Sequence, residues 1–286
     1  MKNITLLAFV DGSAHTLTIC EYAALLSQSS KSLVKLYHII ENPIETERND
    51  FSGALNLGAR TKLMGALVSE GEKKSKAAIV QGRKILDEAK DKLVEFGCLN
   101  VELRLRTGDI AEALKSKEAG GDVVLIGKRG QKSSLKKHRI GKNFERIVRA
   151  STKPLFVANS TFKRINNVLV AYDGSIPSKR ILKYLLDDTV FGNIAISVLS
   201  VSRSSKDRLD LKYKPSILNL NKNNLPLNFI NATGDPFEQI MARLDNSCYD
   251  MLAIGAYGHS KLRNLFIGST TSNLIHASPV PVLLSK

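Results

Sequence analysis

The sequence predicts an α/β fold built from two tandem copies of one five-stranded, parallel, doubly wound domain. Three observations lead to this prediction: landmarks of the first half recur in the second, short apolar runs alternate with helical patterns, and a pair of glycines follows one of those runs. Strands that alternate with helices form a Rossmann-like parallel sheet with right-handed crossovers. Such sheets bind ligands at the carboxyl ends of their strands.

Four landmarks recur in the same order, which indicates a duplicated domain. They are an Asp-Gly-Ser after an apolar run, a Thr-Gly-Asp, an Ile-Gly-x-x-Gly and an Ala-Ser before a final apolar run, at 11–13 and 173–175, 107–109 and 233–235, 126–130 and 254–258, and 150–151 and 277–278. We therefore expect one domain at residues 1–161 and a second at 162–286.

The elements of the first copy follow from apolar periodicity. Strands are expected at 4–10, 33–40, 101–107, 123–127 and 154–159, and helices at 14–28, 76–96, 109–119 and 141–151. The helix at 76–96 carries one apolar stripe, as a helix lying on a sheet requires. Asp109 and Asp235 each precede a helix, whose N-terminal dipole favours a carboxylate.

The two copies differ in their second helix. The first landmarks lie 162 positions apart but the Thr-Gly-Asp landmarks only 126, so the second copy lacks about 36 residues. Its segment 203–226 holds two Pro and several Asn, which predicts at most a short helix. The first copy has an apolar surplus from Leu55 to Val68. This surplus is either a packing arm or lid, or a loop.

The glycine pair of the second copy predicts a phosphate site. Residues 249–255 are expected to form a strand, and those after Gly268 a helix with Leu274 and Ile275 inward and Pro279 at its end. The intervening pattern is Gly255-x2-Gly258-x9-Gly268-Ser269. A helix N-terminus attracts anions, and glycines let a phosphate approach the main chain. The alternative is a loop whose glycines serve only turn geometry.

This pattern resembles the nucleotide motif of the universal stress protein family, in its ATP-binding branch. Both halves look like its domains, whose fold is described as adenine nucleotide alpha hydrolase-like. The resemblance implies ATP, with or without Mg²⁺, as ligand. It places Asp173 beside the adenosine, the main chain of Val201 at the adenine edge, Gly255 and Gly258 at the ribose and phosphates, and Gly268, Ser269 and Thr270 at the phosphates.

The first copy departs from the motif. Ten residues separate Gly130 from Gly141, where the second copy has nine, and Lys142-Asn143 stand in place of Ser269-Thr270. The extra residue shifts the final glycine, and the hydroxyl is lost. We therefore expect one complete site, in the second copy. A degenerate or differently used site is expected in the first, around Asp11, Ile39 and Gly127.

The remaining features exclude some functions and leave others open. A net charge of +15 favours anionic partners, but the basic run 128–149 lacks interleaved aromatics and is better explained as a solvated face than as a nucleic-acid site. Nucleic acid is not excluded. The histidines and the three scattered cysteines form no metal or catalytic pattern. No apolar run has the length of a membrane span, and a reducing cytoplasm is expected.

The leading hypothesis is a tandem universal stress protein that binds ATP in its second copy and has a regulatory or protective role. One alternative is a slow ATPase or phosphotransferase, although no general base can be named. Another is a nucleotide-free protein that binds anionic partners.

The final strands, 154–159 and 279–285, begin with Pro and are expected to pair as an internal pseudo-dimer. Residues 55–68, of this chain or a second, are expected to cover the second sheet. Whether two chains form a homodimer is left open.

Overall fold

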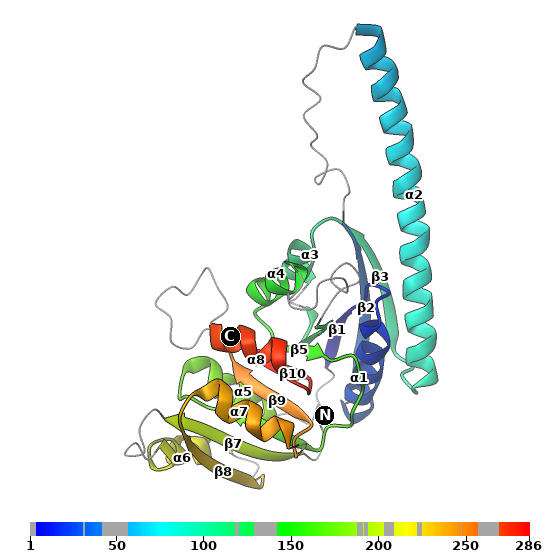
Figure 1. The fold of residues 1–286 in the computed structure, drawn as a ribbon. Helices are drawn as coiled ribbons and strands as arrows, with labels where there is room; N and C mark the ends of the chain where they lie inside the picture. The colour runs from blue at the N-terminus through cyan, green and yellow to red at the C-terminus, as the bar shows by residue number, and fades with distance from the viewer. Residues whose placement is uncertain are drawn as a thin grey trace.

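The protein forms one ten-stranded sheet with helices on both faces (Figure 1). The computed structural model describes residues 4–30, 32–41, 57–117, 120–128, 142–187, 191, 194–202, 209–221, 225–246, 248–256 and 269–286. The strand order is β3-β2-β1-β4-β5-β10-β9-β6-β7-β8. Each half of the chain contributes five consecutive strands, which confirms the α/β class and the tandem arrangement.

The first half follows the expected order. Its elements are β1 (Thr5–Phe9), α1 (His15–Ser30), β2 (Leu33–Ile40), α2 (Leu57–Glu95), β3 (Val101–Thr107), α3 (Ile110–Lys117), β4 (Val123–Gly127), α4 (Lys142–Ala150) and β5 (Leu155–Ala158). Its strands pair in parallel. All five strands lie within one residue of the expected bounds.

The second half repeats this order with shorter connections. Its elements are β6 (Asn167–Ala171), α5 (Ile176–Asp187), β7 (Ala195–Ser202), α6 (Leu209–Leu220), β8 (Leu227–Thr233), α7 (Pro236–Asp245), β9 (Met251–Gly255), α8 (Ser269–Ala277) and β10 (Val282–Ser285). Leu274 and Ile275 are buried on α8, as expected. The strands of this half are also parallel to one another.

Two hydrophobic cores lie on opposite faces of the sheet. Alternate residues of a strand point to opposite faces, so Leu6 joins one core while Leu7 joins the other. The core that contains Leu6 also contains residues of α1, α2, α5 and α6. The core that contains Leu7 also contains residues of α3, α4, α7 and α8. The two halves therefore share both cores.

The halves meet where β5 pairs antiparallel with β10. Phe156 lies opposite Leu283, and neither side chain has measurable exposure to solvent. The ring of Phe156 lies 4.8 Å from Tyr22 of α1 and 6.4 Å from Phe191 of the second half. This antiparallel pair confirms the expected pairing of the final strands.

Helix α2 is longer than predicted. It begins at Leu57 instead of residue 76, so residues 57–75 continue a helix and form neither a lid nor a loop. Side chains 69–77 are exposed all round, which removes the periodic signal, while an ion pair of Lys74 with Glu70 at 2.8 Å supports the helix. Residues 55 and 56 lie outside the described residues.

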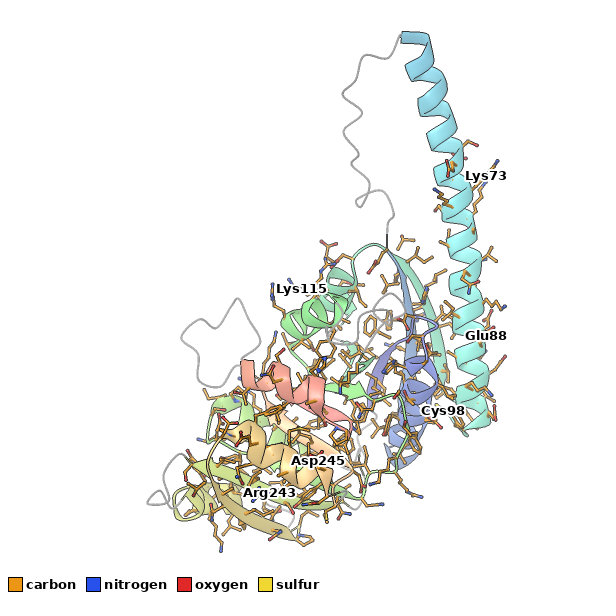
Figure 2. All side chains as sticks on the ribbon, in the orientation of Figure 1. Lys73, Glu88, Cys98, Lys115, Arg243 and Asp245 are labelled. Carbon is orange, nitrogen blue, oxygen red and sulfur yellow. The ribbon has the colours of Figure 1, made fainter. Side chains whose placement is uncertain are left out.

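The projecting part of α2 does not cover the second half of its own chain. Helix α2 packs on α1, β2 and β3, and its N-terminal part, where Lys73 lies, extends beyond the body of the protein (Figures 1 and 2). The second half is covered by α6, which packs on β7 and β8 and buries Ile217. The short second helix is confirmed, and the expectation that residues 55–68 cover that sheet within one chain is wrong. Coverage by a second chain stays untested.

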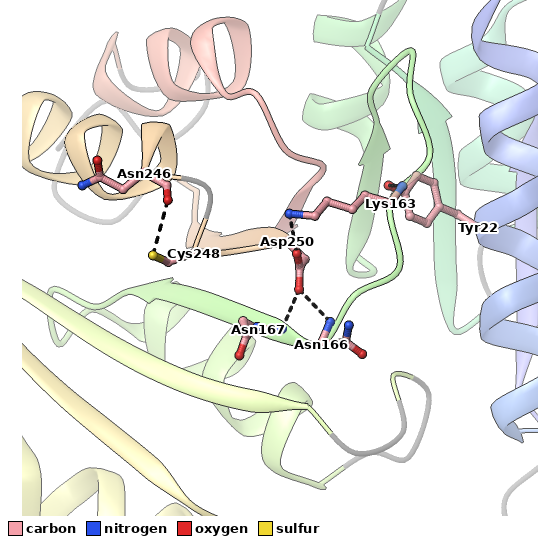
Figure 3. A network of polar contacts seen from close by, with 7 residues as sticks. All are labelled: Tyr22, Lys163, Asn166, Asn167, Asn246, Cys248 and Asp250. Carbon is pink, nitrogen blue, oxygen red and sulfur yellow. Dashed lines mark hydrogen bonds and ion pairs between the residues drawn. The ribbon is translucent and has the colours of Figure 1, made fainter.

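A carboxylate before β9 ties the connection between the halves to the sheet (Figure 3). One oxygen of Asp250 accepts hydrogen bonds from the main-chain N–H groups of Asn166 and Asn167, at 3.0 and 2.9 Å. Its other oxygen lies 2.8 Å from the Lys163 ammonium. The main-chain N–H of Lys163 donates to the Tyr22 hydroxyl at 3.1 Å. Lys163 therefore connects α1 of the first half to Asp250 of the second.

We predict that this connection stabilises the protein in a pH-dependent way. Burial pushes the pKa of Asp250 up, but hydrogen bonds from Lys163, Asn167 and Asn166 outweigh burial, and the pKa lies below its ordinary value. A carboxyl with a depressed pKa stabilises the fold above its unfolded-chain pKa, and that contribution is lost as the pH falls through the folded-state pKa.

The test replaces Lys163 with Gln and measures urea unfolding across a pH series. The free energy of unfolding should fall at pH 7, and the difference from the wild type should shrink as the pH falls below about 4. Arg164→Gln removes the same charge at the exposed neighbouring position and is the control. A difference that is constant across the pH series, or equal in both variants, would contradict the prediction.

Candidate functional site

The ends of β6 and β9 bring two predicted site residues together. These strands are parallel neighbours, with Ala171 opposite Ile254. The loop at Asp173 and the strand end at Gly255 therefore lie together at the carboxyl ends of the strands. Helix α8 begins at Ser269, and Thr270 is exposed in its first turn. Gly258 and Gly268 lie outside the described residues, so the loop between them stays a prediction.

The Asp-Gly-Ser loop has the same shape in both halves. The main-chain N–H of Ser175 donates to the Asp173 carboxylate at 3.0 Å, and Ser13 donates to Asp11 at the same distance. Gly174 and the matching Gly12 have φ angles of 77° and 76°, which favour glycine. This loop therefore does not distinguish a complete site from a degenerate one.

Gly255 has a packing role that the sequence did not reveal. A Cβ atom added to Gly255 would lie 2.5 Å from the main-chain nitrogen of Ser178 and 2.9 Å from the Cβ of Pro177. The first turn of α5 therefore fills the space that we expected this glycine to leave for a phosphate. A nucleotide contact through the main chain of Gly255 stays a prediction.

The main chain of Val201 lies at the same end of the parallel strands as Asp173 and Gly255. The pairing of β7 with β6 ends at Leu199, whose carbonyl accepts a hydrogen bond from the Tyr172 N–H at 2.8 Å. Successive strand residues direct their N–H and C=O groups to opposite sides, so Val201 shares the side of Leu199. Its groups lie beyond the end of β6, on the side of Asp173. A donor and an acceptor there match the edge of a purine.

Tyr213 of α6 is a neighbour of the site that sequence reasoning missed. Its hydroxyl donates to the carbonyl of Asp173 at 2.9 Å. Its ring lies against Gly174, where an added Cβ would be 2.4 Å from the Tyr213 Cε1 atom. In the first half, Ile85 of α2 occupies the corresponding place over Gly12. The segment 203–226 holds two Pro and several Asn, and no local pattern indicates that Tyr213 lies beside Asp173.

Basic residues near the first-half site hold the structure together. Lys128, which follows β4, donates through its ammonium to the carbonyl of Ser278 in the second half at 3.0 Å. Arg146 of α4 forms an ion pair with Asp109. Lys128 thus reaches across the junction of the halves. Residues 129–141 lie outside the described residues, so the charges of that part of the run are not placed.

The expected helix-capping carboxylates are confirmed. Asp235 accepts from the N–H groups of Phe237 and Glu238 at 2.9 and 3.1 Å, and Asp109 accepts from Ala111 at 2.9 Å. Each carboxylate satisfies N–H groups that the first turn of a helix leaves unpaired. These two residues therefore have a local structural role in both halves.

No group of metal-ligating side chains is found in the described part of the chain. Within the described ranges, no three His, Cys, Asp or Glu side chains lie close enough to hold a metal ion. The three cysteines are free thiols, and burial raises the pKa of Cys20 to about 12, which keeps that thiol protonated at neutral pH. Among the described helices, none combines the length and the hydropathy of a membrane span.

Comparison with known sequences identifies the family. The profile described as "Universal stress protein family" matches residues 4–159 and 220–286. The chain belongs to the universal stress protein family. Universal stress protein Slr1230 from Synechocystis sp. (strain ATCC 27184 / PCC 6803 / Kazusa) is 29% identical over 286 residues, covering 99% of both chains. The profile does not match the residues between these two ranges, which include most of the segment 203–226 that holds the short second helix.

Solved structures share the two-domain architecture. A universal stress protein from Archaeoglobus fulgidus DSM 4304 superposes with a TM-score of 0.73 at 20% identity, over 100% of this chain and 99% of that one. A structure named as a putative universal stress protein from Pseudomonas aeruginosa UCBPP-PA14 gives 0.58 at 15% identity, over 99% and 92%. At these identities the likeness concerns the fold alone.

Some universal stress proteins bind adenine nucleotides. One solved structure is a universal stress protein in complex with cAMP, and another is a family protein from Arabidopsis thaliana with AMP bound. Their TM-scores to this chain are 0.37 and 0.32, and they cover 56% and 42% of it.

We predict that Gly255 is required for stability even without a ligand. Gly255→Ala forces its Cβ against the first turn of α5 and should lower the free energy of unfolding by about 1–3 kcal/mol. Gly71 on α2 has no atom within 4 Å of an added Cβ, so Gly71→Ala should leave stability unchanged or raise it by up to about 1 kcal/mol. Urea unfolding of both variants is the measurement. Equal stabilities for Gly255→Ala and the wild type would refute the packing role.

Proposed function

We propose that this universal stress protein binds ATP through its second half and acts as a regulatory or protective protein in a stress response. The observation that carries the proposal is that three features lie together at the carboxyl ends of the second-half strands. These features are the Asp173 loop, the main-chain groups of Val201, and the end of β9 before α8. Family membership supports an adenine nucleotide as the ligand class.

Each residue has a role in this proposal. The exposed carboxylate of Asp173 binds the ribose side of the adenosine, and Val201 pairs with the adenine edge through its main chain. Gly258, Gly268, Ser269 and Thr270 bind the phosphates, aided by the positive end of the α8 dipole. The ATP binds either with Mg²⁺ or without it. Gly255 acts mainly by positioning α5 against β9.

The first half is proposed to lack this function. Its motif has one extra residue between Gly130 and Gly141, and Lys142-Asn143 replace the hydroxyl residues. The ammonium of Lys128, which follows β4, donates to the Ser278 carbonyl of the second half. These differences affect the phosphate part of the site, while the Asp11 loop keeps its geometry.

The nucleotide is proposed as a ligand, with slow hydrolysis as the alternative. The cytoplasm is the proposed location, because the exposed Cys248 is a free thiol and such thiols persist in reducing compartments. A purified sample that retains ATP unhydrolysed over hours would support the binder, and turnover lost in Gly268→Val would support the enzyme. A nucleotide-free interaction protein would bind no ATP at all.

Titration calorimetry with ATP, with and without Mg²⁺, tests the site. We expect about one ATP per chain, and we expect Gly268→Val to weaken binding by at least about tenfold because its Cβ branch blocks the phosphate. Gly141→Val makes the same change in the first half and should leave binding unchanged. Two equal sites per chain, or full affinity in Gly268→Val, would contradict the assignment.

A second prediction concerns Tyr213. Tyr213→Phe removes the hydrogen bond to the Asp173 carbonyl, and we expect ATP affinity to fall about threefold to tenfold, the effect of one neutral hydrogen bond. Tyr37→Phe removes a hydroxyl from β2 of the first half and is the control. The dissociation constant is measured by the same titration. An unchanged constant in Tyr213→Phe would show that the loop needs no support from α6.

A further inference from the structure

The two outer strands of the sheet differ in charge. Strand β3 at one edge contains Glu102, Arg104 and Arg106, whereas β8 at the other edge reads Leu-Asn-Phe-Ile-Asn-Ala-Thr. Proteins commonly protect an open edge with charged residues, Pro or a bulge. Strand β8 has neither a charge nor a proline. Its seven residues are all exposed or partly exposed.

The register of β8 shows which of its main-chain groups face outward. The N–H of Gly234 donates to the carbonyl of Ser202 on β7 at 2.9 Å, so even-numbered residues of β8 face β7. The odd-numbered residues direct their N–H and C=O groups to the open side. These are Leu227, Phe229, Asn231 and Thr233. In the described part of the chain, β8 ends the strand order on this side.

We propose that β8 pairs antiparallel with β8 of a second copy of this chain. A two-fold axis at Ile230 places Phe229 opposite Asn231 and Leu227 opposite Thr233 of the other copy, so all four outward-facing residues find partners. Ile230 then lies opposite itself, as an apolar pair. A contact between identical surfaces closes after two chains and leaves the charged β3 edges outermost.

The β3 edge carries the charges that β8 lacks. Arg104 is the residue that corresponds to Ile230, and the same two-fold axis would place the two Arg104 side chains opposite each other and Glu102 opposite Arg106 of the other copy. The first pair is repulsive and the other two pairs are attractive, so these side-chain charges largely offset one another. Charged residues on an outer strand discourage pairing with another chain, and β8 is the outer strand without them.

Salt dependence separates this dimer from other kinds of association. Two chains that each carry a net charge of +15 repel one another, and salt screens the repulsion. Pairing of a neutral strand should therefore strengthen as the salt concentration rises. Chains bridged by a polyanion would behave in the opposite way, because salt weakens that attraction.

Sedimentation velocity of the full chain over about a hundredfold range of concentration, at low and high salt, is the first test. The wild type should shift from one chain to two, more strongly at high salt. Asn231→Lys places a charge at the edge, twice per dimer, and should weaken the dimer by about tenfold. Asn231→Pro removes one outward N–H without removing a bond to β7 and should weaken it similarly.

Thr107→Lys is the matched control, because it adds the same charge at an exposed position of the β3 edge. It should leave the dimer unchanged. Equal dissociation by Thr107→Lys and Asn231→Lys would show that net charge, and not the β8 edge, sets the association. A wild type that stays a single chain at every concentration and salt, or a dimer that both Asn231 variants retain, would overturn the proposal.

Cysteine cross-linking tests the register directly. Opposed residues of a non-hydrogen-bonded antiparallel pair have Cα atoms about 4.5 Å apart, which is within reach of a disulfide. In a Cys248→Ser background, Ile230→Cys should form a disulfide-linked dimer on mild oxidation. Asn228→Cys should not, because the register places its two copies too far apart. Cross-linking that is equal at both positions, or that occurs at Asn228→Cys alone, would refute the two-fold at Ile230. Neither outcome depends on nucleotide binding.

Discussion

The antiparallel pairing of β5 with β10 is the contact on which the rest of the architecture depends. Among the strands that the structure describes, every other pair is parallel, so this reversal joins two parallel sheets into one and turns their carboxyl ends in opposite directions. Phe156 and Leu283 are fully buried there, and Tyr22 and Phe191 extend the contact into both halves. The carboxyl ends of β1 and β4 therefore lie on the opposite side of the shared sheet from the carboxyl ends of β6 and β9.

The two halves have residues at matching positions around their strand ends, but these residues make different contacts. Asp122 and Asp250 occupy matching positions and each accepts a main-chain N–H from the first residue of the neighbouring strand. Only Asp250 also binds Lys163. Over the Asp-Gly-Ser loops, α2 provides Ile85 and α6 provides Tyr213. The shorter α6 thus supplies a hydroxyl at the site that retains the full glycine motif.

Much of this fold could be predicted because the sequence repeats its landmarks and its apolar runs are short. The strands, the final-strand pairing and the adjacency of Asp173 to Gly255 followed from those signals. The start of α2 could not be found, since residues 69–77 are solvated on all sides and show no periodicity. The contacts of Gly255 with Ser178 and of Tyr213 with Asp173 join segments far apart in the chain, which no local pattern reports.

The central claim is that a nucleotide engages the second half alone, at the ends of β6, β7 and β9 and the start of α8. Hydrogen exchange of the full chain, with and without ATP, tests it most directly because it reports each half separately. We predict slower exchange at 173–178, 200–202 and 256–272, with 11–16, 38–40 and 128–145 unchanged. Protection of the first-half segments, or of both sets equally, would contradict the account.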